Sequence, residues 1–314
     1  PQFKRWYSQA GTPRLQARGS YNADERSYTL TLSQSCPATP DQPAKEPFVI
    51  PVTLGLLSPD GQALPLQLAG ETDSAPQRTL VLTEDRASWT FTGLDSEPVP
   101  SLLRGFSAPV LLDDGLKTTE LLTLLAHDSD AFNRWEASQR LMLGCALRAL
   151  SATPDGDVLP AQLVQALRAV LRHPQLDAAF KELALTLPSE NYIADHLDTV
   201  DPQRVHALRE TMRAQLARDL RDDWQWAWDT HRANGAYVPD TTSSGRRALA
   251  GLAMTMLCLD AVATGDDVLP GKVYQQFKDA GNMTDRFNAL HALVVSGHAL
   301  AQDALTRFHK LFKD

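Results

Sequence analysis

Hydrophobic and polar residues alternate along the first third of the chain with a period of two, which is typical of half-buried β-strands. The alternation is clearest at Tyr28, Leu30 and Leu32. Residues 48–57 form a longer apolar run that contains Pro51. This run favours an edge strand or a bulge, because proline donates no hydrogen bond to a neighbouring strand. About seven short strands separated by turn signals predict an antiparallel β-sandwich over residues 13–114.

From residue 115 onward the apolar residues recur every three or four positions, which is the period of an amphipathic helix. The stripe that starts at Val205 follows Asp201, an N-cap residue, and Pro202, which suits the first turn of a helix. Residues 249–262 are apolar nearly all round, which predicts a helix buried on several sides. About nine helices joined by short loops indicate stacked helix pairs.

The composition changes where the periodicity changes. Residues 1–115 hold 13 of the 20 prolines and none of the eight histidines, whereas the formal charge is −4 on each side of residue 115. The border therefore reflects backbone preference and separates two domains. We predict an antiparallel Ig-like β-sandwich followed by an all-α superhelical array of the ARM/HEAT-like kind over residues 115–314.

Both ends of the chain look cut. Trp6 and Tyr7 are expected in the last turn of a helix, with Gly11 as its left-handed C′ residue. At the other end, Phe308 and Phe312 continue an apolar stripe that a terminal repeat would cap with polar residues. We expect the chain to begin inside a larger protein and the helical array to be truncated at its C-terminus.

Composition and charge exclude several classes of protein. With 43% hydrophobic and 22% charged residues, the chain is neither disordered nor a disulfide scaffold. The net charge of −8 and the lack of a basic cluster argue against nucleic-acid binding. No run approaches the roughly 18 apolar residues of a membrane helix, so no membrane partner is expected. Three widely spaced cysteines are expected to be buried thiols of a cytoplasmic protein.

Candidate chemistry is sparse. The sequence has no H-E-x-x-H, no C-x-x-C, no P-loop and no nucleophile elbow. His206 and Glu210 lie four apart on one helix and could share a metal, although an ordinary surface pair is the commoner arrangement. Residues 127–130 (HDSD) could be drawn as a general acid/base group, but an N-cap before the following helix is favoured.

The densest aromatic group is formed by Trp224, Trp226 and Trp228. Trp224 and Trp228 share a helix face, and packing against a neighbouring helix is favoured over a ligand surface. Among the basic residues, Arg104, Arg246 and Arg247 could meet a carboxylate terminus or another domain, although most arginines lie on the surface without such a role. We therefore assign no catalytic, cofactor-binding or metal residue to this chain.

Four segments resemble one family of enzymes. They are residues 5–13 (RWYSQAGTP), 99–110 (VPSLLRGFSAPV), 125–137 (LAHDSDAFNRWEA) and 282–286 (NMTDR). Together, in this order, they resemble the bacterial aminopeptidase N family of zinc metallopeptidases. The family has an N-terminal β domain, a thermolysin-like catalytic domain, a small β-sandwich and a C-terminal helical array. The resemblance implies that residues 1–12 are the tail of the catalytic domain and that the chain covers the sandwich and about two-thirds of the array.

The resemblance carries no catalytic residue into this chain. The family's zinc motif, H-E-x-x-H with a downstream glutamate, and its amine-binding G-x-M-E-N motif are both missing, and no tyrosine stands in the matching context. The implied role is that of a non-catalytic region that braces the upstream catalytic domain of the same polypeptide and encloses the chamber in which small peptides are cleaved. The zinc would belong to the parent protein.

Two other interpretations remain at this point. An Ig-like sandwich followed by helical repeats could be a stand-alone scaffold or adaptor without enzymatic activity. A hydrolase built on His206 and Glu210 ranks third and would lose activity when either residue is replaced. An upstream zinc motif would support the peptidase over the scaffold.

Overall fold

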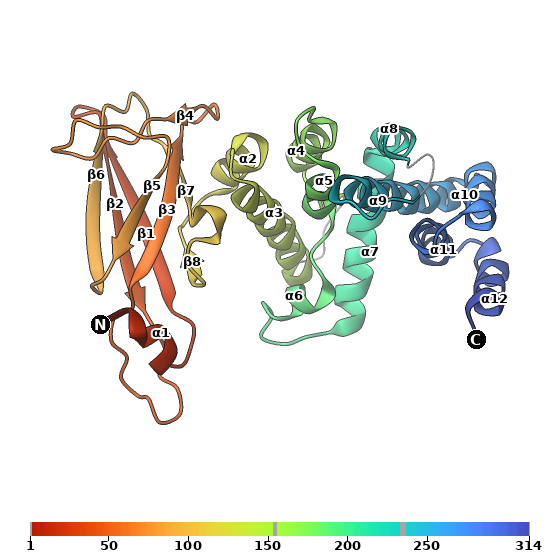
Figure 1. The fold of residues 1–314 in the computed structure, drawn as a ribbon, viewed down its shortest axis with the longest axis horizontal. Helices are drawn as coiled ribbons and strands as arrows, with labels where there is room; N and C mark the ends of the chain where they lie inside the picture. The colour runs from red at the N-terminus through yellow and green to blue at the C-terminus, as the bar shows by residue number, and fades with distance from the viewer. Residues whose placement is uncertain (1, 153–155, 233–236, 314) are drawn as a thin grey trace. The chain divides into compact units, whose positions relative to one another are not determined.

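The computed structural model describes residues 2–152, 156–232 and 237–313. The chain divides into two compact units, Pro1–Ala137 and Ser138–Asp314. The first unit holds the strands and the second is entirely helical in its described residues (Figure 1). The predicted Ig-like β-sandwich and ARM-like helical array are therefore both present.

The first unit contains two sheets. One has the strand order β6-β2-β1-β8, and in the other β3 pairs with β4, β5 and β7. All pairs are antiparallel except β1 with β8, which run parallel from the pair Arg14 and Leu111 onward. The strands are β1 (Arg14–Asn22), β2 (Ser27–Ser35), β3 (Ile50–Leu57), β4 (Ala63–Leu64), β5 (Arg78–Leu82), β6 (Arg86–Thr92), β7 (Val99–Leu102) and β8 (Leu111–Asp113).

The alternation predicted from the sequence explains this core. Leu30 and Leu32 of β2 point to the buried face. Thr29 and Thr31, which alternate with them, point to the other face and each make a cross-strand hydrogen bond of 2.9 Å to β6. Pro51 lies in the part of β3 that pairs only with β5, because β7 joins its other edge from Leu54 onward. The proline thus occupies a local edge of an otherwise central strand, as expected from its missing donor.

The N-terminal helix ends earlier than predicted. A short 3-10 turn, η1 (Gln2–Lys4), leads into α1 (Arg5–Ser8), and Gln9 is the C-cap residue in an extended conformation. Gly11 has a φ of 94° but follows the helix by three residues, so the predicted C′ role was wrong. Its conformation serves a turn beside Cys36, whose Sγ would lie 3.2 Å from an added Cβ.

After the strands, the series of longer helices begins at Thr118, and the first helix of this series packs within the sandwich unit. A 3-10 turn, η2 (Arg104–Phe106), follows β7, and α2 (Thr118–His127) contacts β7. The division between the two units falls inside α3 (Ala131–Ser151). Asp130 accepts a hydrogen bond from the Asn133 amide at 2.9 Å, so the acidic segment before α3 caps this helix as favoured from the sequence.

The second unit is built around α9 (Thr241–Thr264). Twelve of its 24 residues are buried, and it contacts α5, α7, α8, α10 and α11, which explains its apolar character on nearly every side. Asp201 caps α7 through the Arg204 amide, as predicted. The other helices are α4 (Ala161–Arg172), α5 (Ala178–Leu185), α6 (Glu190–Ala194), α7 (Pro202–Asp219), α8 (Arg221–His231), α10 (Val268–Asp279), α11 (Met283–Ser296) and α12 (Leu300–Phe312).

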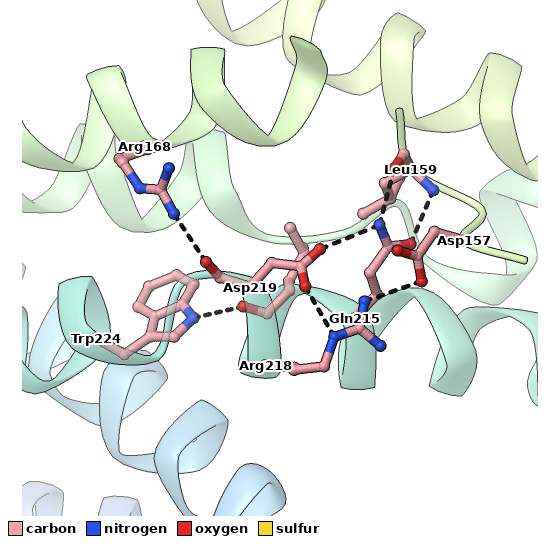
Figure 2. Close-up of polar contacts among 8 residues, drawn as sticks. Asp157, Leu159, Arg168, Gln215, Arg218, Asp219 and Trp224 are labelled. Atoms are coloured by element: carbon pink, nitrogen blue, oxygen red, sulfur yellow. Dashed lines mark hydrogen bonds and ion pairs between the residues drawn. The ribbon is translucent and has the colours of Figure 1, made fainter. Parts of the chain in front are cut away.

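A buried polar network joins α7 to the segment before α4 (Figure 2). The Gln215 side chain exchanges two hydrogen bonds of 2.8 Å with the backbone of Leu159, one in each direction. Arg168 of α4 donates to the Asp219 carbonyl at 2.8 Å, and the Trp224 indole donates to the Leu216 carbonyl at 2.9 Å. The Leu159 amide and carbonyl are thereby both paired by one side chain, and the Leu216 carbonyl accepts the indole in addition to the Leu220 amide.

One helix in the described part of the chain is long and apolar enough to cross a membrane. An 18-residue window of α9 has a mean hydropathy of 1.4, so the expectation that no segment approaches this character was wrong. Of this window, 61% is buried inside the protein, as in the core helix of a folded domain. Burial by neighbouring helices therefore accounts for the hydropathy of α9.

Candidate functional site

The structure adds a third ligand-type residue to the pair His206 and Glu210. Glu190, at the start of α6, lies against α7, and its Oε1 is 2.8 Å from the His206 Nδ1. One ligand atom from each of the three residues lies within 4.8 Å of the others, the only such trio found among the described residues. The sequence could not reveal Glu190, because it is 16 residues from His206 and reaches it only through the α6–α7 turn.

The charges around this trio do not suit a cation. Glu210 is already bonded to Arg213 at 2.9 Å, and the Arg209 guanidinium lies 4.0 Å from the same carboxylate oxygen. A metal would have to displace a guanidinium and break the His206–Glu190 hydrogen bond. Three protein ligands are typical of a catalytic zinc site, but such ligands are held by further hydrogen bonds rather than by competing cations. The trio therefore does not fit a resident zinc ion.

The acidic segment before α3 has a structural role. Arg104 is buried and bonds Asp128 at 2.8 Å, with side-chain exposures of 7% and 0%. Arg104 also donates to the Ser101 hydroxyl at 2.8 Å. An added Cβ on Gly55 would lie 2.3 Å from the Arg104 Cζ, so only glycine leaves room for the guanidinium over β3. The sequence suggested a carboxylate terminus or another domain as the partner of Arg104, with an unpartnered surface position as the commoner case. Its partner is instead the buried side-chain carboxylate of Asp128 within the same unit.

The three tryptophans behave as their spacing predicts. Trp224 and Trp228 are 0% and 4% exposed, whereas Trp226 lies on another face with the Arg172 guanidinium 4.3 Å from its ring centre. His231 packs edge-on against Trp226, with ring centres 5.6 Å apart. Packing, favoured over a ligand surface, is confirmed for Trp224, whose indole is also hydrogen-bonded. Trp228 is different, because its indole nitrogen has no partner.

Two histidines of the helical unit, the half-buried His231 and the more exposed His291, resist protonation. Burial lowers the pKa of His231, and nearby Lys181 and Arg246 lower it further, against an opposing hydrogen bond to the Ala227 carbonyl. Burial likewise lowers the pKa of His291, with a smaller contribution from Arg213. The unfolded chain therefore binds more protons than the folded chain just below the usual histidine pKa of about 6.5.

We expect the helical unit to lose stability as the pH falls from about 7 to about 5. The sign follows from the lowered pKa values: the folded unit must hold neutral histidines that the unfolded chain protonates. His231→Gln and His291→Gln are each expected to flatten this dependence, measured as the urea midpoint by far-ultraviolet circular dichroism. His309→Gln, at an exposed position of α12, is the matched control. If the urea midpoint changed with pH equally steeply in all three variants, His231 and His291 would not be the source of the pH dependence.

A cavity of about 600 Å³ lies among α8, α9, α10 and α11. We call it the α8–α11 cavity, and its volume is within the range of small-molecule sites. Arg247 of α9 lies in its wall with 4% of its side chain exposed. Its lining includes Trp228, Arg232, Tyr237, Arg247, Lys272 and Gln276, together with the carboxylates Asp229, Asp279 and Asp285.

Arg247 is held in place by contacts of different kinds. Its guanidinium carbon lies 4.4 Å from the Tyr237 ring centre, and its Nη1 donates to the Val238 carbonyl at 3.1 Å. The Nε is 3.7 Å from an Asp285 oxygen, too far for a hydrogen bond. The sequence suggested Arg247 as a possible partner of a carboxylate terminus or another domain, but gave no sign of Gln276. Arg246, its neighbour, is exposed.

The comparisons with known proteins place this architecture in a family. The family model described as domain of unknown function (DUF3458_C) ARM repeats matches residues 118–314, and the model of its companion Ig-like fold (DUF3458) matches residues 11–115. Since the ARM-repeat model covers more than half of the chain, the chain belongs to this family. It corresponds to the C-terminal portion of an aminopeptidase N-type protein.

Three curated relatives are aminopeptidase N proteins. Those of Escherichia coli, Haemophilus influenzae and Caulobacter vibrioides are 34%, 35% and 35% identical to this chain, over 98%, 97% and 99% of its length. The chain spans only about a third of each relative, 35%, 34% and 34% respectively. The solved structure of Legionella pneumophila aminopeptidase A in complex with aspartic acid shares the fold, with a TM-score of 0.81 and 23% identity over 100% of this chain and 35% of that one.

Proposed function

We propose that this chain is the non-catalytic C-terminal region of a zinc-dependent aminopeptidase that removes N-terminal amino acids from peptides. The observation that carries the proposal is similarity to aminopeptidase N along nearly the whole chain, combined with coverage of only a third of each relative. The sequence contains neither H-E-x-x-H nor G-x-M-E-N. The catalytic residues are accordingly expected elsewhere in the parent polypeptide.

In this proposal the chain's partner is the upstream catalytic domain of the same cytoplasmic polypeptide. The sandwich braces that domain, and the helical array encloses the active-site chamber and admits only small peptides. Enclosure would also exclude water from the closed site, which strengthens the electrostatic interactions there. The zinc ion of the parent would supply an activated water. In this proposal the residues of this chain hold no part of that chemistry, and the guanidiniums beside Glu210 support this for the trio of Glu190, His206 and Glu210.

We expect the purified 314-residue chain to retain far less than one zinc ion per molecule and to release no amino acid from peptides. The reason is that its best ligand trio is neutralised by Arg209 and Arg213. Elemental analysis after dialysis and a fluorogenic aminopeptidase assay measure the two quantities. His206→Ala serves as the control. Zinc near one per chain that disappears in this variant would overturn the proposal for this region.

The enclosing role predicts a change in size selectivity. The parent polypeptide is shortened by removing the segment that corresponds to residues 116–314 of this chain. The shortened protein is expected to keep its zinc, and its rate on long peptides is expected to rise relative to its rate on dipeptides. Rates for the two substrate lengths are compared at matched zinc content, which shows that the catalytic part has folded. An unchanged ratio of the two rates would contradict enclosure.

A further inference from the structure

We propose that the α8–α11 cavity binds a short peptide segment through its backbone amides. This site is assigned from the chain's own residues and goes beyond the function proposed above. Its test uses the 314-residue chain alone and involves no peptidase activity. Failure of this inference would therefore leave the aminopeptidase proposal as it stands.

Three residues around the α8–α11 cavity carry buried polar atoms that have no hydrogen-bond partner. Trp228 Nε1, Arg247 Nε and Gln276 Oε1 are buried and make no hydrogen bond, and the Arg247 Nε has only an Asp285 oxygen at 3.7 Å. All three residues line the α8–α11 cavity. These atoms are three of the five such side-chain atoms in the described part of the chain. Buried polar groups are normally paired, so their concentration at one cavity points to a ligand that pairs them.

The three atoms differ in whether they donate or accept a hydrogen bond. Trp228 and Arg247 offer N–H donors, and the Gln276 oxygen is an acceptor. The complementary ligand must therefore present both carbonyl oxygens and N–H groups. Each peptide unit carries one of each, so a segment of a few residues meets both requirements along its length. An apolar ligand would leave all three atoms unpaired.

The charged side chains that line the α8–α11 cavity balance one another. Arg232, Arg247 and Lys272 line the cavity together with Asp229, Asp279 and Asp285. Three cations and three carboxylates produce no net attraction for an anion such as phosphate or for a cation such as a polyamine. Several of these charges already have polar partners, for example Asp285 with the Asn282 side chain at 2.6 Å. The lining thus suits an uncharged polar ligand.

The aromatic side chains favour a peptide over a sugar. Sugars bind proteins by stacking on exposed aromatic faces as well as by hydrogen bonding. Here the Arg247 guanidinium lies over the Tyr237 ring at 4.4 Å, and the Arg232 guanidinium lies over the Trp228 ring at 5.2 Å. Both rings therefore already carry a cation on one face.

The indole N–H of Trp228 allows a direct test by nuclear magnetic resonance. The chain is labelled with 15N-tryptophan, which gives six indole signals, and Trp228→Phe identifies the signal of interest. The probe is N-acetyl-trialanine amide, which has peptide units but no charged terminus. We expect a saturable downfield shift of the Trp228 indole proton. The Trp224 indole, already bonded to the Leu216 carbonyl, is the internal control and is expected to stay in place.

Gln276→Met removes the acceptor while keeping the length of the side chain, and is expected to weaken binding at least about fivefold. The matched control is Gln302→Met on the exposed face of α12, which is expected to leave binding unchanged. Should Gln276→Met fail to fold, as judged by circular dichroism, calorimetry on Trp228→Phe tests the loss of one donor with the same expected weakening.

Four results would overturn the proposal. They are the lack of a saturable shift up to the solubility limit of the probe, a response to maltotriose but not to the capped tripeptide, binding of uncapped trialanine only, and unchanged affinity in the cavity variants. The second result would assign the cavity to a carbohydrate. The third would assign it to charged peptide termini, with Arg247 as the partner of the carboxylate.

Discussion

Replacing Arg104 by methionine is expected to lower the free energy of unfolding of the sandwich unit by about 3–5 kcal/mol. The substitution leaves the Asp128 carboxylate, which is 0% exposed at its side chain, without its charged partner. One oxygen of Asp128 already lacks a hydrogen bond, and the other would keep only the Asp130 amide at 2.9 Å. The cost therefore arises mainly from an uncompensated buried charge rather than from a lost contact.

The loss is measured by urea unfolding combined with hydrogen exchange of amides in β3 and β7, which report on this unit alone. Arg18→Met is the matched control, because the Arg18–Asp113 pair is exposed at 49% and 58% and solvent screening is expected to leave its contribution to stability small. Adding Asp128→Asn to Arg104→Met removes the stranded charge and is expected to restore part of the stability. Equal losses for Arg104→Met and Arg18→Met would contradict this account.

Trp224→Ala is expected to destabilise the helical unit by about 3–5 kcal/mol. Trp224 is 0% exposed, and its removal leaves a cavity against α9 that the surrounding helices fill only in part. The variant also loses the hydrogen bond from the indole to the Leu216 carbonyl shown in Figure 2. Urea unfolding followed by far-ultraviolet circular dichroism measures the effect, since the helices dominate that signal.

Trp226→Ala is the control for Trp224→Ala, two residues away on the same helix. Trp226 is half-buried and meets Arg172 and Lys181 through its ring face, so its replacement is expected to cost much less. If both tryptophan variants lost equal stability, the helical-face argument for Trp224 would be wrong. The unfolding curves are analysed as two transitions, because a chain with two compact units need not unfold in one step.

The fold class could be predicted from local patterns because each pattern reflects a periodic backbone. The alternation at Leu30 and Leu32 predicts a strand with one buried face, and the all-round apolar character of residues 249–262 predicts a central helix. Caps such as Asp201 and Asp130 were predictable for the same reason, since a side chain reaches the amides of its own next turn. Helix ends without a strong cap, as at Ser8, were placed wrongly.

The polar sites could not be predicted in the same way. Glu190 meets His206 only because α6 folds back on α7, and Trp228, Arg247 and Gln276 come from three different helices. No sequence period relates such residues, because their approach depends on how helices pack and not on the repeat within one helix. Arg104 was expected to meet a carboxylate terminus or another domain if it had a partner, and only the packed sandwich unit shows that its partner is the Asp128 side chain.

The sequence by itself determined the two-domain order, the sandwich and helical classes, the capped helix starts and the resemblance to aminopeptidase N. These properties depend on hydrophobic period, short-range hydrogen bonds and strings of neighbouring residues. The tertiary structure alone decided which charges are buried, that Glu210 is neutralised by arginines, and that three residues with unpaired polar atoms line one cavity. Burial and pairing are properties of distant residues brought together, and the energy of a polar group depends on whether that approach gives it a partner.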